Sequence, residues 1–505
     1  MSKKNKCGIC GKTAKRVCSG VGGVICSACC GEKRNSEISC GSDCVHSPFS
    51  TTGYDLWLKV DAGLVSKCIR CVISNYGKVR FEGVIHEMSF GDVSFEDMSF
   101  KESFTMAAGA AVYNILFVER DKHGKTLADE WESRSWEGLN NDEKVMMRYL
   151  KSARVTVIEV QKILNYQAME CIDMFDPERK PFIMFDRSTA SNAVRFVKIF
   201  SWLTHFPNFS RMAHSGIEIT DFIVNEFMDT IKSETRKESK KVDFRIKDHL
   251  SKNFGKYCRL STDLALEKRD AMLDNIDAHH CVATYGIEGK ASEVGAILEK
   301  YPEFRWNDKD PEEDDPADTL YYDWVRTGES KAIEKEMHPA FHHDDESLGV
   351  GSLANVCFRP DELVIEVISK RKYKFAKKMV IKYFGSLVVL KQEKVVDMAK
   401  QLKNKPVGEV SKKKEKSQGC MSPEDEQKIL QVFYENKYKK FIDENIPMID
   451  NKTPRQAAEE PGLRPKLIEL MKLHINGLEK MNKRKSVNIN IDWVLDELGL
   501  AELKG

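Results

Sequence analysis

The spacing of apolar residues changes along the chain and predicts which segments are helical and which are extended. Residues 54–152 repeat apolar positions at helical intervals, and the almost wholly apolar stretch at 104–118 predicts a buried helix. From Ala153 onward the apolar runs become short and β-branched, as at 155–160. Four or five such runs within residues 153–225, separated by turn-forming residues, predict a small β barrel or sandwich.

Changes in charge divide the rest of the chain. Residues 226–275 combine helical spacing with a high density of charges, which is typical of a solvated helical segment or linker. Two strand patterns, at 353–358 and 362–368, precede an amphipathic helix at 371–384. A Lys-rich linker then leads into a last segment with helical periodicity.

Length and composition are those of an ordinary globular protein. A chain of 505 residues is long enough for about three to four domains, and its content of 41% hydrophobic and 31% charged residues is typical of a soluble protein. The longest apolar stretch, residues 106–118, is interrupted by Asn114 and is shorter than the roughly 20 residues of a membrane-spanning helix. The N-terminus lacks the apolar core of a secretion signal, so we expect a cytoplasmic protein with no membrane partner.

The spacing of the cysteines carries the strongest chemical signal. Eight of the fifteen cysteines lie within residues 1–50, as C-x2-C, C, C-x2-C-C and C-x3-C, among several glycines. A two-residue gap lets both sulfurs of one turn face the same ion, and a segment this short and polar needs metal to fold. The spacing therefore predicts structural zinc, with two ions for eight thiolates. The expected ligands are Cys7, Cys10, Cys18, Cys26, Cys29, Cys30, Cys40 and Cys44.

The pairing of these cysteines stays open at this point. By analogy with interleaved zinc folds, Cys7 and Cys10 join Cys26 and Cys29 around one ion, and the other four hold the second. A single ion with unused thiols is the alternative, and His46 is a reserve ligand. A disulfide framework would need an exported protein. Four protein ligands leave no open position for water, which argues against zinc catalysis.

The cysteine-rich head is also basic. Its Lys and Arg residues outnumber its acidic residues, and Arg16, Lys33 and Arg34 are placed to contact nucleic acid or protein. Outside the head, Cys68 and Cys71 lie three positions apart on one face of an expected helix. This spacing favours thiols in the core over a third metal site.

No catalytic motif is recognisable in the body of the sequence. It has no phosphate-binding glycine loop, zinc-protease helix, nucleophile elbow or kinase motif set. The carboxylate-rich residues 308–318 are typical of a solvated loop. The His- and acid-rich segment 338–346 lacks a periodic framework that would fix a metal site, and His279 and His280 beside Cys281 are no stronger candidates.

Helix-start signals mark the C-terminal segment. Ser422 and the acidic residues after it predict one helix, and Thr453 followed by Pro454 predicts another. The Ile-Pro…Lys-Thr-Pro-Arg-Gln-Ala-Ala pattern at residues 446–458, with the Leu-rich helix after it, resembles the toxin-binding domain of Xre/MbcA/ParS-type antitoxins over about fifty residues. The resemblance implies a helical fold and a protein partner. The residues it places at the contact are Pro447, Thr453, Pro454 and Arg455.

Two departures limit what this resemblance implies. Asp450 and Asn451 stand where the family usually has a glycine, although Asn tolerates the same backbone angles. No helix-turn-helix DNA reader is recognisable beside the segment, so an antitoxin role is not implied. The wider arrangement looks like bacterial proteins in which a Cys-rich or SEC-C-type zinc motif accompanies such domains, although the SEC-C pattern itself is absent from this sequence.

Together these patterns predict an α+β multidomain protein. The preferred function is a zinc-binding, non-enzymatic adaptor that recognises a protein partner through its C-terminal domain. Nucleic-acid binding through the basic zinc head is the second hypothesis, and an enzyme in the central region is the third. The expected parts are a zinc module (1–50), a mainly helical domain (54–152), a small β barrel or sandwich (153–225), a charged helical segment (226–275), an α+β domain (276–400), a Lys-rich linker (401–421) and a helical antitoxin-like domain (422–505).

Overall fold

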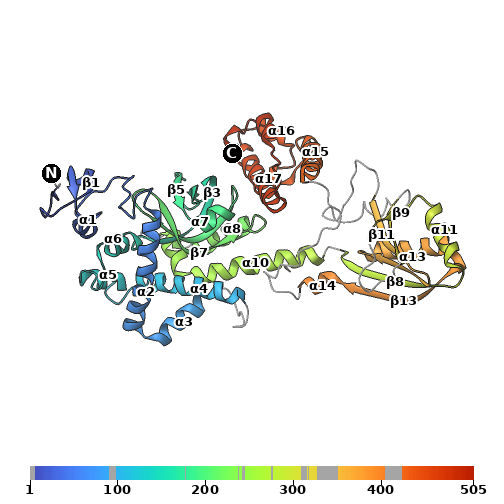
Figure 1. The fold of residues 1–505 in the computed structure, drawn as a ribbon, viewed down its shortest axis with the longest axis horizontal. Coiled ribbons are helices and arrows are strands. Elements are labelled where there is room, and N and C mark those ends of the chain that lie inside the picture. The colour runs from blue at the N-terminus through green and yellow to red at the C-terminus, as the bar shows by residue number, and fades with distance from the viewer. Residues whose placement is uncertain are drawn as a thin grey trace. The chain divides into compact units, whose positions relative to one another are not determined.

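The protein, seen in a computed structural model, mixes helices and sheets in two compact units (Figure 1). One unit joins residues 1–265 to residues 421–505, and residues 266–420 form the other. No helix among the described residues is both long and apolar enough to cross a membrane. The structure describes residues 6–89, 98–176, 178–236, 238–240, 245–274, 277–308, 316, 318–326, 351–403 and 423–505.

The cysteine-rich head has a very small core. Ile25 and Ile38 are buried together with Ala14 and three cysteines, so thiols make up much of its interior. The turn of its hairpin ends at Gly22, whose φ of 64° is a backbone angle that favours glycine. Its elements are the antiparallel strands β1 (Arg16–Cys18) and β2 (Gly23–Ile25), the turn η1 (Ser19–Val21) and the helix α1 (Ser27–Lys33).

A set of helices follows the head. Two of them begin at capping boxes, where Thr126 and Asn140 each accept a backbone N–H while the acidic side chain three residues later bonds back. Most of the apolar stretch at 104–118 is buried, as the sequence predicts, and its last turn is π-helical. The helices are α2 (Tyr54–Tyr76), α3 (Lys78–Met88), α4 (Met98–Tyr113), η2 (Asn114–Val118), α5 (Leu127–Ser133) and α6 (Asn141–Leu150).

Five strands then close into a barrel in the order β3-β4-β5-β7-β6. The β-branched run at 155–160 is buried at every position, because the barrel core and the surrounding helices cover both faces of β3. The short pairing of β5 with β7 is parallel, and the other neighbours are antiparallel. The elements are β3 (Arg154–Asn165), β4 (Ala168–Asp173), β5 (Phe182–Phe185), α7 (Arg187–Asn192), β6 (Lys198–His205) and β7 (Ser210–Ile219).

Three further helices complete the core around the barrel. Phe227, Phe254 and Tyr257 pack their rings around Phe200 of β6, with ring centroids 5.6, 5.4 and 6.4 Å from it. The last buried residue of the third of these helices is Leu264, close to residue 265, where the first segment of this unit ends. The elements are α8 (Val224–Thr235), η3 (Glu238–Lys240), α9 (Ile246–Lys252) and α10 (Phe254–Asp274).

The second unit contains a six-stranded antiparallel sheet in the order β13-β8-β12-β11-β10-β9. The amphipathic helix expected at 371–384 is confirmed, and its apolar stripe packs into the core of this sheet. The segment 338–346 and part of 308–318 lie outside the described residues. The elements are β8 (His279–Ile287), α11 (Ala291–Lys300), β9 (Phe304–Asn307), β10 (Leu320–Arg326), β11 (Gly351–Phe358), β12 (Glu362–Val367), α13 (Lys370–Phe384), η5 (Gly385–Leu387), β13 (Val388–Asp397) and α14 (Met398–Lys403).

The C-terminal segment is helical and has its own core. Thr453 caps a helix whose first residue is Pro454, as the sequence predicts, and the capping box is completed by Gln456. Tyr438, at the centre of this core, stacks edge-on against His474. The elements are α15 (Pro423–Phe441), η6 (Pro447–Ile449), α16 (Pro454–Glu459), α17 (Arg464–Lys485), α18 (Asp492–Glu497) and η7 (Ala501–Leu503).

A buried ion cluster connects these C-terminal helices to the barrel within the first unit. Lys472 of α17 lies 2.6 Å from one carboxylate oxygen of Glu159 on β3, and Lys198 of β6 lies 3.3 Å from the other. The side chains of Glu159, Lys198 and Lys472 are 1%, 2% and 9% exposed. Nearby, Phe196 of the barrel, with a φ of 63°, is buried in the C-terminal core.

Candidate metal centre

The first pair of cysteines lies in a tight turn that precedes β1. The amide of Cys7 donates to the Lys12 carbonyl at 2.7 Å, and the amide of Gly11 donates to the Cys7 carbonyl at 3.0 Å. Gly11 has a φ of 70°, so this turn needs a residue without a Cβ. The turn brings the side chains of Cys7 and Cys10 to the same side.

The second pair lies where β2 passes into α1. Cys26 is the N-cap of α1, and its sulfur accepts the Cys29 amide at 3.4 Å. The Gly8 amide donates to the Val24 carbonyl at 2.9 Å, which ties the first turn to the end of β2. This backbone hydrogen bond therefore holds the Cys7–Cys10 turn next to the Cys26–Cys29 turn.

These four cysteines form a set that can hold one metal ion. Their sulfur atoms all lie within 4.8 Å of one another, and the Cys10 and Cys26 sulfurs are 3.7 Å apart. Tetrahedral Zn–S bonds of about 2.3 Å place neighbouring sulfurs about 3.8 Å apart, so the spacing fits such an ion. The part of the chain that the structure describes contains no other group of three or more His, Cys, Asp or Glu ligands this close together.

The local electrostatics favour the thiolate form of Cys7 and Cys26 and disfavour the thiolate form of Cys29. Backbone N–H groups of Cys10 and Cys26 lower the pKa of Cys7 to about 6, and the Cys29 amide lowers the pKa of Cys26. Contact with the Cys10 and Cys26 sulfurs raises the pKa of Cys29 to about 12. A divalent cation removes this conflict, because it compensates the charge of four neighbouring thiolates.

The other four cysteines lie in the same head but are less tightly gathered. Cys18 ends β1, Cys30 is buried in α1, and Cys40 and Cys44 lie in the loop after it. Burial raises the pKa of Cys40, and the charges of Cys44, Cys30 and Cys18 raise it further. The three thiols are therefore near Cys40, although the four sulfurs do not meet the spacing of the first set.

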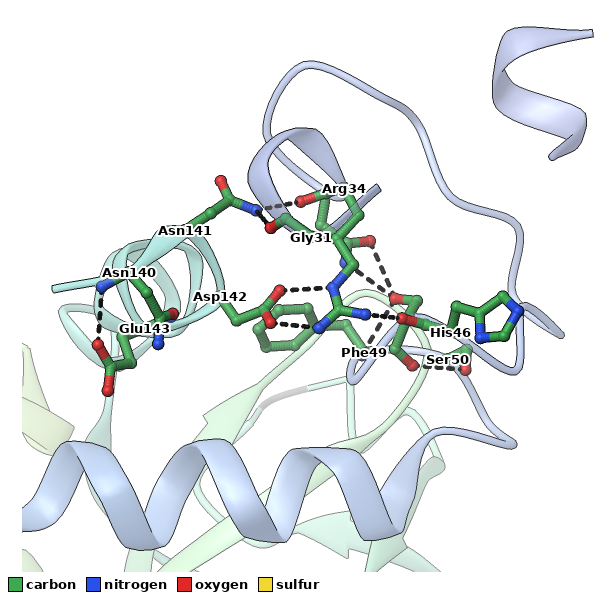
Figure 2. A network of polar contacts seen from close by, with 11 residues as sticks. Gly31, Arg34, His46, Phe49, Ser50, Asn140, Asn141, Asp142 and Glu143 are labelled. Carbon is green, nitrogen blue, oxygen red and sulfur yellow. Dashed lines mark hydrogen bonds and ion pairs between the residues drawn. The ribbon is translucent and has the colours of Figure 1, made fainter. Parts of the chain in front are cut away.

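The basic residues proposed for nucleic acid have different surroundings. Lys33 forms an ion pair with Glu37 one turn later, and Arg16 is partly exposed on β1. Arg34 is largely buried and holds the head against α6 (Figure 2). Its guanidinium is therefore committed to a contact inside the protein.

Arg34 belongs to a network of polar contacts between the head and α6, and sequence reasoning did not identify this network. The Arg34 Nε donates to Asp142 Oδ1 at 2.8 Å, a second guanidinium nitrogen donates to Oδ2, and a third donates to the His46 carbonyl (Figure 2). Asn141 donates to the carbonyls of Gly31 and Arg34 at 3.2 and 2.9 Å. The signal available in the sequence was the Asn-Asp pair at the start of α6.

Replacing Arg34 by Ala should loosen the head without releasing metal from the four-cysteine set. The substitution leaves the Asp142 carboxylate, whose side chain is only 12% exposed, without its bidentate partner. Loss of such a partner costs about 1–3 kcal/mol. We expect faster amide hydrogen exchange at residues 44–50, measured by mass spectrometry.

Lys33→Ala is the matched control for this prediction, because the Lys33–Glu37 pair is more exposed and joins residues only four positions apart, at the end of α1. It should leave exchange at residues 44–50 unchanged. Equal protection of this segment in both variants would contradict a tethering role for Arg34.

The remaining cysteine and histidine candidates have structural contacts. Cys68 is buried in α2 and its thiol lies 3.9 Å from the Met147 sulfur, and Cys71 is half-buried one turn further on. Burial raises the pKa of both thiols, which suits the predicted core position. His279 bonds to Asp277 and His280 bonds to Glu366, both within the second unit.

The candidate partner residues of the C-terminal segment are unequally accessible. Pro447 and Arg455 are exposed, whereas Thr453 is half-buried in its capping box and Pro454 is buried. Arg455 forms ion pairs with Asp443 and Glu497. Arg455 and Pro447 are thus the members of this set that a partner can reach.

Comparison with known proteins does not identify a family for this chain. No family model matches the chain, and neither the curated proteins nor the solved structures include a match.

Proposed function

We propose that this chain is a zinc-binding, non-enzymatic adaptor that recognises a protein partner through its C-terminal helical segment. The observation that carries the proposal is the set formed by Cys7, Cys10, Cys26 and Cys29. Four thiolates fill the tetrahedral positions of zinc and leave none for a substrate or an activated water. The metal then stabilises a head whose apolar core is too small to fold alone.

The proposal includes zinc as the metal and a second ion in the head. All-thiolate sites select soft or borderline metals, and zinc is the usual one in structural sites. Cys18, Cys30 and Cys44 lie near Cys40, and these four thiolates are the proposed ligands of the second ion. We place the protein in the cytoplasm, because eight thiols kept for metal require a reducing compartment.

An exposed apolar stripe on α15 supports a protein partner. Ile429, Val432 and Phe433 are 55%, 57% and 53% exposed, and their spacing puts them on one face of the helix. Large apolar side chains grouped on one helix face are typical of a surface that another protein covers. The resemblance of residues 446–458 to a toxin-binding domain points to a partner for the same segment.

The test is affinity capture of the full-length protein from lysate of its own cells, before and after nuclease treatment. We expect a discrete protein that stays bound after nuclease and is lost from a Val432→Ser, Phe433→Ser double variant. Removal of two large apolar side chains that a partner covers weakens binding by about tenfold or more.

Val79→Ser is the control, because Val79 is 83% exposed on α3, far from the C-terminal segment in sequence. Capture should survive this change. Retention of the partner by the α15 double variant would contradict the proposed surface. Partners that disappear with nuclease would instead support the nucleic-acid hypothesis.

A further inference from the structure

A polar cavity of about 390 Å³ lies between α2 and the β6–β7 end of the barrel, in the first unit. Its size falls within the range of small-molecule sites. Part of its wall is apolar, from Val65, Leu150 and Met212, and the rest carries polar side chains in the middle of the largest core of the protein. A polar cavity at such a place needs a physical reason, because buried polar groups cost free energy unless they are bonded.

Asp61 is the most unusual residue of this wall. It lies on the buried face of α2, one turn after Trp57 and one turn before Val65, where helical spacing calls for an apolar side chain. The described residues offer its carboxylate no hydrogen bond or ion pair. Burial raises the pKa of Asp61 to about 6, and the charge of Arg211 offsets this only in part.

Three hydrogen-bond donors of residues in the cavity wall also have no partner among the described residues. They are the buried Trp57 Nε1, Thr204 Oγ1 and Arg211 Nε atoms. Trp57 and Thr204 are 3% and 1% exposed. Thr204 and Arg211 are directly opposite each other on β6 and β7, and the Arg211 guanidinium lies 5.0 Å from the centre of the Trp57 ring. The free donors therefore surround one point of the cavity.

The charge of Arg211 is already balanced. Its guanidinium forms an ion pair with Asp186, and one of its nitrogens donates to the Phe185 carbonyl at 2.8 Å. Asp186 in turn accepts from the Ser188 hydroxyl and the Thr189 amide at the start of α7. The cavity thus presents a set of unpaired donors together with an uncompensated carboxylate, with no excess positive charge to hold a simple anion.

We propose that this cavity binds a small zwitterion of amino-acid size. The ligand carboxylate accepts from Trp57, Thr204 and Arg211, and its ammonium group donates to Asp61. The apolar wall beside Val65 and Leu150 leaves room for an amino-acid side chain. Such a ligand satisfies every free donor and the one free carboxylate together, whereas an anion would leave Asp61 unpaired and a simple cation would leave the donors unpaired.

The experiment measures thermal unfolding of the full-length protein with each of the twenty free amino acids at millimolar concentration, followed by calorimetry for any that bind. We expect at least one of them to raise the melting temperature. Asp61→Asn should weaken its affinity roughly tenfold to a hundredfold, since it removes a charged acceptor. Trp57→Phe keeps the ring, removes the N–H and should weaken binding independently.

The variants also separate binding from folding. Asp61→Asn removes a buried unpaired carboxylate, so the free protein should melt at the same or a higher temperature while binding is lost. Asp55→Asn, on the same helix with a side chain 72% exposed, should bind like the unaltered protein. The proposal is overturned if no amino acid stabilises the unaltered protein, or if both cavity variants bind as tightly as it does.

Discussion

Replacing Cys26 by Ser is expected to release the metal ion of the first set and unfold the head while the barrel stays folded. Cys26 has two roles, since it is a ligand of this set and the N-cap of α1. The apolar core of the head is confined to a few residues, so an ion bound by the first set would supply most of its folding free energy. Structural zinc contributes about 10–16 kcal/mol in small zinc-binding peptides, far more than such a core.

The measurement is zinc per chain by mass spectrometry, together with limited proteolysis. In the Cys26→Ser protein, cleavage should become rapid within residues 6–50 and stay slow within residues 154–219. Cys71→Ser, which changes a half-buried thiol on α2, should alter neither quantity. Full zinc content in the Cys26→Ser protein would show that the first set is not the metal site.

The same measurement tests the second ion. If Cys18, Cys30, Cys40 and Cys44 hold an ion of their own, the unaltered protein contains two ions and Cys40→Ser contains one. A single ion in both proteins would restrict the head to the first set. Acidification should release metal, because protons compete with the ion for the thiolates.

Replacing Glu159 by Gln should detach the C-terminal helices from the barrel more easily than any surface change. The substitution leaves the ammonium groups of Lys198 and Lys472 buried without the carboxylate that joins them. Breaking a buried ion pair by removing one partner costs about 3–5 kcal/mol. We expect faster amide hydrogen exchange along α17. We also expect the first unfolding transition to occur at a lower urea concentration.

Glu218→Gln is the matched control for this prediction. Glu218 also pairs with a lysine of α17, Lys480, at 2.6 Å, but both side chains are nearly half exposed. An exposed pair contributes about 0–1 kcal/mol, so α17 should keep its protection. Equal effects of the two substitutions would show that burial of the Glu159 cluster contributes nothing to docking.

The pH dependence of this contact has a defined sign. Burial raises the pKa of Glu159, but Lys472 and Lys198 outweigh it and the net pKa is lowered. Its stabilisation is therefore present above the ordinary glutamate pKa and is lost as pH falls through the lowered value. Burial lowers the pKa of Lys472, while Glu159 and Glu469 raise it above its ordinary value, so this contribution is lost only at high pH. The cluster should hold at neutral pH.

Local signals were sufficient for several elements of the fold. The helix start at Thr453 and Pro454 follows from chemistry within three residues and occurs in the structure. The β-branched run at 155–160 is a strand. The two-residue gaps predict that Cys7 acts with Cys10 and Cys26 with Cys29. That the two pairs share one ion was expected only by analogy with interleaved zinc folds, and the structure brings the four sulfurs together.

Features that depend on distant residues were not predictable in this way. The run at 193–200 has a strand pattern, but β6 begins only at Lys198, because Phe196 has a φ of 63° and places its ring in the C-terminal core. Glu159 within a buried strand is a visible irregularity, yet nothing local identifies Lys472 as its partner. Asp61 is a similar case, since its significance comes from Thr204 and Arg211 on two other elements.

The position of Lys472 in the sequence also determines the order in which the two sides of this contact are synthesised. The last strand of the barrel ends at Ile219, so a ribosome adding about 5–20 residues per second completes the barrel roughly 13–50 s before Lys472 exists. During that interval Glu159 faces water and the barrel has an uncovered side. Docking of α17 therefore follows synthesis of the barrel, and a chain truncated before α17 would keep this patch open to chaperones or proteases.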